Sequence, residues 1–284
     1  MDGILLLYKE KGPTSFKAIE QVKKQFKINK IGHTGTLDPM AEGLLVVLLG
    51  NATKIADYVD DTKEYEMQIQ FGTATDTDDA MGNEINTLPV PADLADRINA
   101  KIPDFTGKIM QVPPAYSAIK KDGKKLYELA RAGKEVKPEP RAVEIFSIEV
   151  LDVSGTTARL RAACSSGTYM RSLARDLAEA VNTCGHLSYL KRTKIGKFSS
   201  DNALKLSEIE DLQKHTVSIN EALYKVKTAE ISAPEQAMIK NGIALKNRFG
   251  FKPGDVIKAV FDGKVLAMCT VEGGVLKINR GIEV

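Results

Sequence analysis

Apolar residues in this chain of 284 residues recur with two periods, one of two residues and one of about 3.6 residues. The first period is clearest in KEYEMQIQFG, where Tyr65, Met67, Ile69 and Phe71 fall on one face with polar residues between them. Such strict alternation is typical of a strand with one buried face. Further apolar or alternating runs predict strands at residues 3–8, 44–49, 143–150 and 157–167.

The second period predicts the helices. After KGPTS, apolar residues recur at helical spacing, and either Thr14 or Ser15 can cap the start of that helix. The residues on its apolar face are Phe16, Ile19, Val22 and Phe26. Further helices are expected at residues 51–61, 93–102, 124–132 and 167–181.

Strands in runs, joined by helices without a regular strand–helix–strand rhythm, predict an α+β fold on a mixed or mainly antiparallel sheet. A boundary is expected near residues 225–232. Beyond it, Asp262-Gly263 and Gly273-Gly274 separate three short apolar runs, and such dipeptides favour tight hairpin turns. We therefore expect a main domain over residues 1–226 and a small C-terminal β-barrel over residues 228–284, which needs support from the main domain because of its size.

Charge is distributed in blocks, although the formal net charge is only +3. Residues 73–106 carry seven acidic and two basic side chains, whereas residues 115–137 carry seven basic and three acidic ones. Residues 186–197 carry four basic side chains and no acidic one. This pattern is compatible with a polyanion bound along one face, but from charge alone an ordinary solvated surface is the preferred interpretation.

The cysteine count and the apolar runs bear on the cellular compartment. Cys164, Cys184 and Cys269 are far apart and odd in number, which argues against a disulfide framework and for a reducing compartment. The start, MDGILLLYKEKG, does not have the pattern of a signal peptide. Since no apolar run approaches the ~20 residues of a membrane helix, we expect a soluble, cytoplasmic protein.

Several enzyme classes lack their motifs here. The three histidines form no ligand-spaced pair, and no phosphate loop GxxxxGK[ST], strand-linked GxGxxG or GxSxG elbow is present. The acidic stretch DTDDAMGNEINT fails the calcium-loop pattern, because Met81 and Thr87 stand where Gly and Glu are required. Enzymes that use a metal, a nucleotide cofactor or a serine nucleophile are therefore disfavoured.

Two charged residues remain as candidates for chemistry. Asp38 lies between a glycine-rich turn and an apolar run in KIGHTGTLDPMAEGLLVV, and Arg171 lies at a helix start in CSSGTYMRSLARDL. An Asp before Pro is commonly a turn residue, and an Arg is commonly a surface residue. A cation in the first turn of a helix nevertheless faces the positive end of the dipole, which favours an anionic partner. From the residues alone, the structural and catalytic interpretations both stay open.

The segment GHTGTLDPMAEGLL resembles the signature loop of the TruB family of tRNA pseudouridine synthases. Six further segments resemble family motifs in the same order. They are KGPTS, KEY, GTATDTDDAMG, QVPPAYSAIKKDGKKLYELARAG, CSSGTYMRSLARDL and HLSYLKRTKIGKF. The resemblance covers residues 3–226 and is weaker for the C-terminal unit, which is similar to the PUA-type RNA-binding module of the family. Glu10 stands where the family often has Pro, in a turn where we expect little consequence.

The resemblance implies a cofactor-free isomerase built on a curved mixed sheet with a catalytic cleft. The family converts the T-loop uridine of tRNA, position 55, to pseudouridine by exchanging a C–N for a C–C glycosidic bond. It implies that Asp38 is the catalytic carboxylate, Arg171 its ion-pair partner, and Tyr65 the aromatic ring that stacks on the target base. Whether Asp38 attacks the base, attacks the sugar or removes a sugar proton stays open.

The resemblance also implies how the RNA is held after the target base is flipped out. His33 would take the vacated place in the loop, Leu190 would line the uracil pocket, and Tyr169 would contact the substrate. The basic insertion at about residues 113–140 would grip phosphates. Its expected contact residues are Lys120, Lys121, Lys124, Lys125 and Arg131. The expected partner is the T-arm of tRNA, bound by a monomer without metal, membrane or obligate protein partner.

Two alternatives to a stand-alone enzyme are kept. One is a guide-RNA-dependent pseudouridine synthase of a ribonucleoprotein, which the short N-terminus and the full insertion disfavour. The other is a non-catalytic tRNA-binding or folding protein, which the intact Asp38, Tyr65 and Arg171 disfavour. A carboxylate-pair glycosidase is excluded because no second motif carries a carboxylate.

Overall fold

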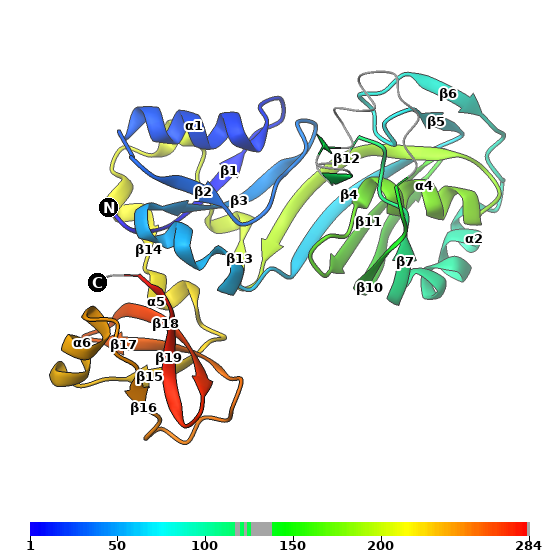
Figure 1. The fold of residues 1–284 in the computed structure, drawn as a ribbon. Helices are drawn as coiled ribbons and strands as arrows, with labels where there is room; N and C mark the ends of the chain where they lie inside the picture. Colours follow the sequence, from blue (N-terminus) through cyan, green and yellow to red (C-terminus); the bar gives the residue numbers. More distant parts are fainter. Residues whose placement is uncertain (117–119, 122–123, 126–137, 283–284) are drawn as a thin grey trace. The chain divides into compact units, whose positions relative to one another are not determined.

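The computed structural model describes residues 1–116, 120–121, 124–125 and 138–282 (Figure 1). The chain forms two compact units. Unit 1 comprises Met1–Asp38, Leu44–Asp60 and Gly196–Val284, and unit 2 comprises Pro39–Gly43 and Asp61–Ile195. The expected division into domains over residues 1–226 and 228–284 stays a prediction.

Unit 2 is built on a sheet in the order β12-β4-β11-β10-β7 (Figure 1). These strands are β12 (Gly185–Ile195), β4 (Lys63–Phe71), β11 (Thr157–Cys164), β10 (Arg141–Ser154) and β7 (Gly107–Gln111). All four pairings between them are antiparallel. The first residues of β3 (Glu42–Leu49) pair with β12 in parallel, so the sheet is mixed. The predicted alternation in β4 is confirmed, since its apolar face is buried and its polar face is partly exposed.

Two helices cover one face of this sheet (Figure 1). They are α2 (Leu94–Lys101), followed by the 3₁₀ helix η2 (Ile102–Phe105), and α4 (Met170–Ala180). The apolar stripe of α4 includes Leu173 and Leu177, both fully buried, and each contributes roughly 1.5–3 kcal/mol through burial. The start of α4 is held against the edge strand β7, because Gln111 at the end of β7 is hydrogen-bonded to the backbone of Tyr169.

The pairing of β3 with β12 depends on Gly43. Its φ is +105°, and a Cβ at this position would lie 2.4 Å from the carbonyl oxygen of Arg192. The Cα partner of Gly43 across the ladder is Arg192 itself. A side chain here would therefore both strain the backbone and separate the two strands.

Gly43→Ala is expected to lower the free energy of unfolding by about 3 kcal/mol, the sum of left-handed backbone strain and overpacking. The measurement is urea unfolding followed by circular dichroism. Gly155→Ala is the matched control, because Gly155 also has a positive φ of +56° but nothing lies within 4 Å of its added Cβ. Equal losses for the two variants would show that the close approach of the strands has no energetic weight.

In unit 1, the strand order is β14-β1-β3, with β2 paired to the other part of β3. The elements here are β1 (Gly3–Lys9), α1 (Ser15–Gln25), β2 (Ile31–His33), η1 (Gly50–Tyr58) and β14 (Thr216–Val217). The shorter connecting elements are β13 (Phe198–Ser199), η3 (Ser200–Asn202), η4 (Leu206–Glu208), η5 (Leu212–His215) and α5 (Ile219–Ala222). Side chains of β1, α1 and β3 share one core, which includes Leu7, Val22 and Val47.

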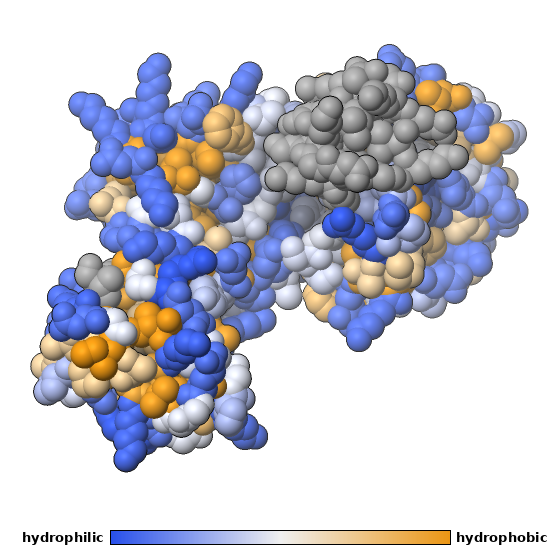
Figure 2. Space-filling model, viewed as in Figure 1, coloured by the Kyte–Doolittle hydropathy of each residue, from blue (hydrophilic) through white to orange (hydrophobic). Residues whose placement is uncertain are grey.

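The helix after KGPTS forms as predicted, but one expectation about its face is wrong. Thr14 is the N-cap, and the buried stripe is Ser15, Ala18, Ile19 and Val22. Phe16 lies about 100° round the helix from Ser15, off this stripe, and is 63% exposed. Figure 2 shows hydrophilic side chains projecting from α1 on the side away from the core, where its lysines are exposed.

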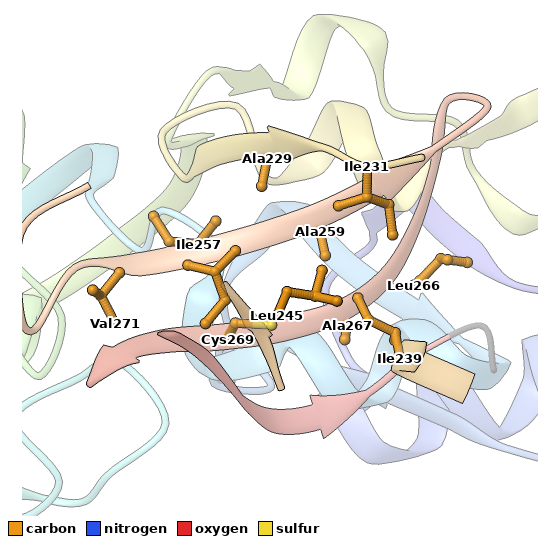
Figure 3. Close-up of a cluster of buried hydrophobic side chains, with 11 residues drawn as sticks. Ala229, Ile231, Ile239, Leu245, Ile257, Ala259, Leu266, Ala267, Cys269 and Val271 are labelled. Atoms are coloured by element: carbon orange, nitrogen blue, oxygen red, sulfur yellow. The ribbon is translucent and has the colours of Figure 1, made fainter. Parts of the chain in front are cut away.

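The C-terminal part of unit 1 forms a separate sheet in the order β15-β17-β18-β19-β16. Its elements are β15 (Lys227–Glu230), α6 (Ala233–Lys240), β16 (Leu245–Lys246), β17 (Val256–Phe261), β18 (Lys264–Glu272) and β19 (Val275–Gly281). Buried side chains from the strands and α6 gather into one cluster around Leu245, Ile257 and Cys269 (Figure 3). Both predicted hairpin turns are confirmed, with positive φ at both central residues of each.

The described part of unit 2 also contains two short pairs of antiparallel strands. One pairs β5 (Thr73–Thr75) with β6 (Glu84–Thr87), and the other pairs β8 (Lys120–Lys121) with β9 (Lys124–Lys125). The helix predicted at residues 124–132 is wrong at Lys124 and Lys125, which form a strand paired with Lys120 and Lys121 instead. Residues 126–132 lie outside the described part of the chain.

The predicted α+β fold is confirmed, with a mixed sheet and a C-terminal β unit. In the described ranges, no helix combines the length and the apolar character needed to cross a lipid bilayer.

Candidate active site

The loop that carries Asp38 is anchored in unit 1 by the residues that precede Asp38. It leaves the sheet at His33, which ends β2 opposite Val47, and the amide of Thr34 donates to Val46 O at 3.2 Å. Leu37 is buried and is hydrogen-bonded to Ser15 of α1 through both of its peptide groups. His33 and Asp38 are half-buried, so the loop presents them at the surface of unit 1.

Tyr65 lies on the buried face of β4 in unit 2. Its Cα partners are Arg192 on β12 and Ala162 on β11, and residues opposed in antiparallel strands project to the same face. Leu190, opposite Met67, projects to that face as well. The sheet thus brings Tyr65 and Leu190, two of the predicted site residues, together with the fully buried Arg192.

Burial sets the protonation state of Tyr65. It raises the pKa of the phenol to about 12, while the Arg192 guanidinium acts in the opposite direction. The ring therefore carries a neutral hydroxyl at physiological pH. This suits an aromatic surface that stacks on a base and hydrogen-bonds as a neutral group.

The same shift predicts a loss of stability in alkali. Burial raises the pKa of Tyr65 to about 12 and that of Cys164 to about 11, above their ordinary values of 10.0 and 9.0. The folded protein binds these protons more tightly than the unfolded chain, so the contribution is complete below about pH 9 and is lost towards pH 12. We expect the urea midpoint to fall steeply above pH 9, and to fall less steeply above pH 10 in Tyr65→Phe. An unchanged slope in that variant would contradict the assignment.

Arg171 is buried in the first turn of α4, and its contacts include Thr77, Tyr116 and Asp79. Nη1 donates to Thr77 O at 3.1 Å, Nη2 donates to Tyr116 O at 3.0 Å, and Nε lies 3.7 Å from Asp79 Oδ2. Asp79 is 6% exposed and places one carboxylate near Arg171, which is favourable for a cation in the first turn of a helix. These three contacts all come from residues of unit 2.

Asp79 belongs to the acidic stretch that failed the calcium pattern. Its Oδ1 accepts from Met81 N at 2.9 Å and from Thr77 Oγ1 at 2.7 Å, while Asp76 Oδ1 accepts from Asn83 N at 2.9 Å. These carboxylates are used to fold the β5–β6 hairpin and to face Arg171. The described residues contain no group of three or more His, Cys, Asp or Glu side chains that could hold a metal ion.

Tyr169, the N-cap residue of α4, is fixed by Gln111 at the end of β7. The Gln111 Oε1 accepts from Tyr169 N at 2.8 Å, and its Nε2 donates to Tyr169 O at 3.1 Å. Gln111 is 1% exposed, and a buried amide needs hydrogen-bond partners. The backbone of Tyr169 supplies a partner for its oxygen and for its nitrogen. Because Arg171 follows two residues later, the contact sets the start of the helix that presents both Tyr169 and Arg171.

Helix α4 also holds the beginning of the basic insertion. Ser172 Oγ donates to Val112 O at 2.8 Å, and Arg175 Nη2 donates to the same oxygen at 2.9 Å. Further along, Lys120 and Lys121 form β8, whereas Arg131 lies outside the described residues. The roles proposed for these three basic residues stay predictions.

The predicted site residues therefore fall in both units. Asp38 and His33 belong to unit 1, and Tyr65, Arg171, Tyr169 and Leu190 belong to unit 2. The expected pairing of Asp38 with Arg171 stays a prediction. Sequence reasoning missed Asp79, Gln111, Arg192 and Ser15. The signal for Gln111 was a polar residue at the inward position of an alternating strand, and for Asp79 it was the recurrence of its segment among the family motifs.

The family follows from comparison with known proteins. The model of the TruB family pseudouridylate synthase N-terminal domain matches residues 23–170, and that of the tRNA pseudouridylate synthase B C-terminal domain matches residues 171–227. The chain belongs to the TruB family of pseudouridylate synthases. It is thus an isomerase that forms pseudouridine. Glu10, the one departure from the family pattern, is 59% exposed at its side chain and pairs with Lys205 at 3.1 Å.

Curated TruB relatives cover most of the chain. tRNA pseudouridine synthase B of Clostridium tetani is 37% identical over 274 residues, which is 94% of this chain and 95% of that protein. tRNA pseudouridine synthase B of Aromatoleum aromaticum is 48% identical over 213 residues, 75% of this chain and 69% of that protein.

Among solved structures, a Cbf5-Nop10-Gar1 complex contains a chain with the same fold. Its TM-score is 0.76 at 24% identity, covering 99% of this chain and 84% of that chain. A structure of an H/ACA RNP bound to a substrate RNA gives a TM-score of 0.75 at 22% identity, with 99% and 84% coverage. These two chains and this TruB-family chain therefore share one fold.

Proposed function

We propose that this protein converts the T-loop uridine of tRNA, position 55, to pseudouridine, acting alone and without a cofactor. The observation that carries the proposal is the similarity of 94% of the chain to a tRNA pseudouridine synthase B at 37% identity. The motifs around Asp38, Tyr65 and Arg171 agree with it, because each supplies the residue type that the reaction requires at its place in the family pattern.

The reaction is an isomerisation. The bond between N1 of uracil and C1′ of ribose breaks, a bond forms between C5 and C1′, and the proton lost from C5 is balanced by one gained at N1. Asp38 is the carboxylate that begins this exchange in its ionised form, by attack on the sugar or the base or by removal of a sugar proton. Arg171 orients the Asp38 carboxylate through a charge-assisted contact.

The target base must leave the folded T-loop to reach Asp38, at a cost of a few kcal/mol. Tyr65 stacks on the extruded uracil, Leu190 lines its pocket, Tyr169 contacts the substrate, and His33 takes the vacated place in the RNA. The buried, neutral ring of Tyr65 and the buried Leu190 on the same sheet face support this assignment. No cofactor is required, since no net oxidation or group transfer takes place.

The basic insertion at residues 113–140 grips tRNA phosphates, and the C-terminal sheet at residues 228–284 adds RNA contacts. If about five cations contact phosphates, raising the salt concentration from 50 to 200 mM is expected to weaken tRNA binding by about 10²-fold or more. The measurement is a fluorescence titration of labelled tRNA over this salt range. A flat response would contradict phosphate gripping.

The second candidate is a guide-RNA-dependent synthase of a ribonucleoprotein. Chains of Cbf5-containing complexes share the fold of this protein. The sequence favours the stand-alone enzyme, because identity to tRNA pseudouridine synthase B proteins reaches 37–48% against 21–24% for the Cbf5-related chains. A monomer in the cytoplasm, without an obligate protein partner, remains our expectation. A non-catalytic tRNA-folding protein is the third candidate.

The deciding experiment is pseudouridine mapping on an unmodified tRNA transcript by carbodiimide labelling and primer extension, with purified protein alone. We expect one new stop, at the T-loop uridine. A transcript with cytidine at that position is the control and should give no stop there. Binding without any stop would favour the guide-dependent or non-catalytic alternative, and a stop at another uridine would show a different target site.

A further inference from the structure

Ser15 makes two hydrogen bonds that the helix it begins does not need. Thr14 caps α1, because its Oγ1 accepts from Lys17 N at 3.1 Å. The hydroxyl of Ser15 is directed to Leu37, 22 residues further along the chain. It accepts from Leu37 N at 2.7 Å and donates to Leu37 O at 3.0 Å, so one side chain engages both polar groups of one residue.

These two bonds act on the residue directly before Asp38. The carbonyl of Leu37 and the amide nitrogen of Asp38 belong to one planar peptide unit. Fixing that carbonyl therefore fixes the plane of the Leu37–Asp38 peptide. The position of the carboxylate then depends only on the backbone and side-chain torsions of Asp38. Ser15 is 1% exposed and Leu37 is 3% exposed, so water does not compete for these contacts.

The position needs such a contact because the local backbone is irregular. Residues 34–38 follow β2 and form neither strand nor helix, so the regular ladder that holds His33 ends before Asp38. A buried peptide outside regular structure requires partners from side chains. Ser15 supplies them at Leu37, and α1 is itself packed on the core through Ile19 and Val22.

We propose that Ser15 is a positioning residue for the Asp38 carboxylate, acting through the Leu37 peptide and without touching the RNA. The inference rests on the proposed function, in which Asp38 carries out the chemistry. Loss of the hydroxyl lets the Leu37–Asp38 peptide rotate, which changes the fraction of molecules with the carboxylate in its reactive place. Displacement of a reacting group by about 1 Å costs up to about 10²-fold in rate.

The test compares Ser15→Ala with Thr14→Ala in the full-length protein. Both remove one hydroxyl from the start of α1, but only Ser15→Ala removes the contact with Leu37. The readouts are the single-turnover rate of pseudouridine formation at saturating tRNA, the dissociation constant for tRNA, and the melting temperature. Ser15→Ala is expected to lower the rate by about 10- to 100-fold with tRNA affinity within about threefold. Thr14→Ala should lower the melting temperature and leave the rate within about twofold, since a lost cap affects stability.

Ser15→Thr separates positioning from folding, because it keeps the hydroxyl while changing the packing. We expect its rate to stay within about fivefold of wild type, so that rate follows the hydroxyl rather than the melting temperature. A Ser15→Ala rate within twofold of wild type would overturn the inference, as would rates of all three variants that simply follow their stability. If the wild-type protein had no activity on tRNA, the proposed function, on which this inference rests, would be overturned. The mapping experiment with wild-type protein detects that outcome separately from any effect of the Ser15 variants.

Discussion

Replacing Asp38 with Asn is expected to lower the rate of pseudouridine formation by at least about 10³-fold, with tRNA affinity changed by less than about threefold. The amide has nearly the shape of the carboxylate, so the loop held by Ser15 and Leu37 is retained. It lacks the negative charge and the basicity that nucleophilic or proton-abstracting catalysis requires. The measurement is a single-turnover assay at saturating tRNA, combined with equilibrium binding.

Asp57→Asn is the matched control for this prediction. Asp57 is also in unit 1, but its side chain is 80% exposed and its nearest cation, Arg280 Nη1, is 3.7 Å away. The control should leave the rate and the affinity within about twofold of wild type. If Asp38→Asn lost tRNA binding together with activity, Asp38 would be a structural residue of the loop; if it kept its rate, the catalytic role would be wrong.

Arg171→Lys is expected to lower the rate by about 10²-fold, although the charge is kept. The guanidinium donates in two directions, to Thr77 O and Tyr116 O, and also faces Asp79. A lysine ammonium is a point charge on a flexible chain and cannot reproduce that planar arrangement. The variant therefore leaves partly buried carbonyls without these donors and loses the fixed orientation that we propose Arg171 gives to Asp38.

Arg175→Lys, one turn later on α4, serves as the control. Its guanidinium is also held by carboxylates, with Nη1 at 2.8 Å from Asp78 Oδ2 and Nε at 2.9 Å from Asp176 Oδ1. We expect a similar fall in melting temperature for both variants but a rate within about fivefold of wild type for Arg175→Lys. Equal rate losses would mean that Arg171 acts only by stabilising unit 2.

The elements were predictable where one local rule dominates. The alternation in β4 identified a half-buried strand because side chains of a strand point to opposite faces. The turns at Asp262-Gly263 and Gly273-Gly274 followed from the residues that tolerate positive φ. Phe16 was assigned to the wrong face because two candidate caps, Thr14 and Ser15, left the first turn ambiguous.

The candidate site was predictable only in part. Asp38, Tyr65 and Arg171 came from motif similarity, and only the need of Arg171 for an anion came from its place on a helix. The buried partners Asp79 and Gln111 carried only weak signals and Arg192 carried none, since a polar residue in sequence is more often exposed. These residues are recognised only in the structure, by their burial and by contacts such as those of Gln111 with Tyr169 and of Asp79 with Arg171.

The sequence by itself determined the family, the main strands and helices, and the residue types available for chemistry, because these depend on local periodicity and on ordered motifs. The tertiary structure decided which hydroxyl caps α1 and which one holds the peptide before Asp38. It also decided that Gly43 must approach Arg192 closely and that the Asp79 carboxylate lies near Arg171. These contacts join residues distant in the chain, and their geometry exists only once the strands and helices are packed.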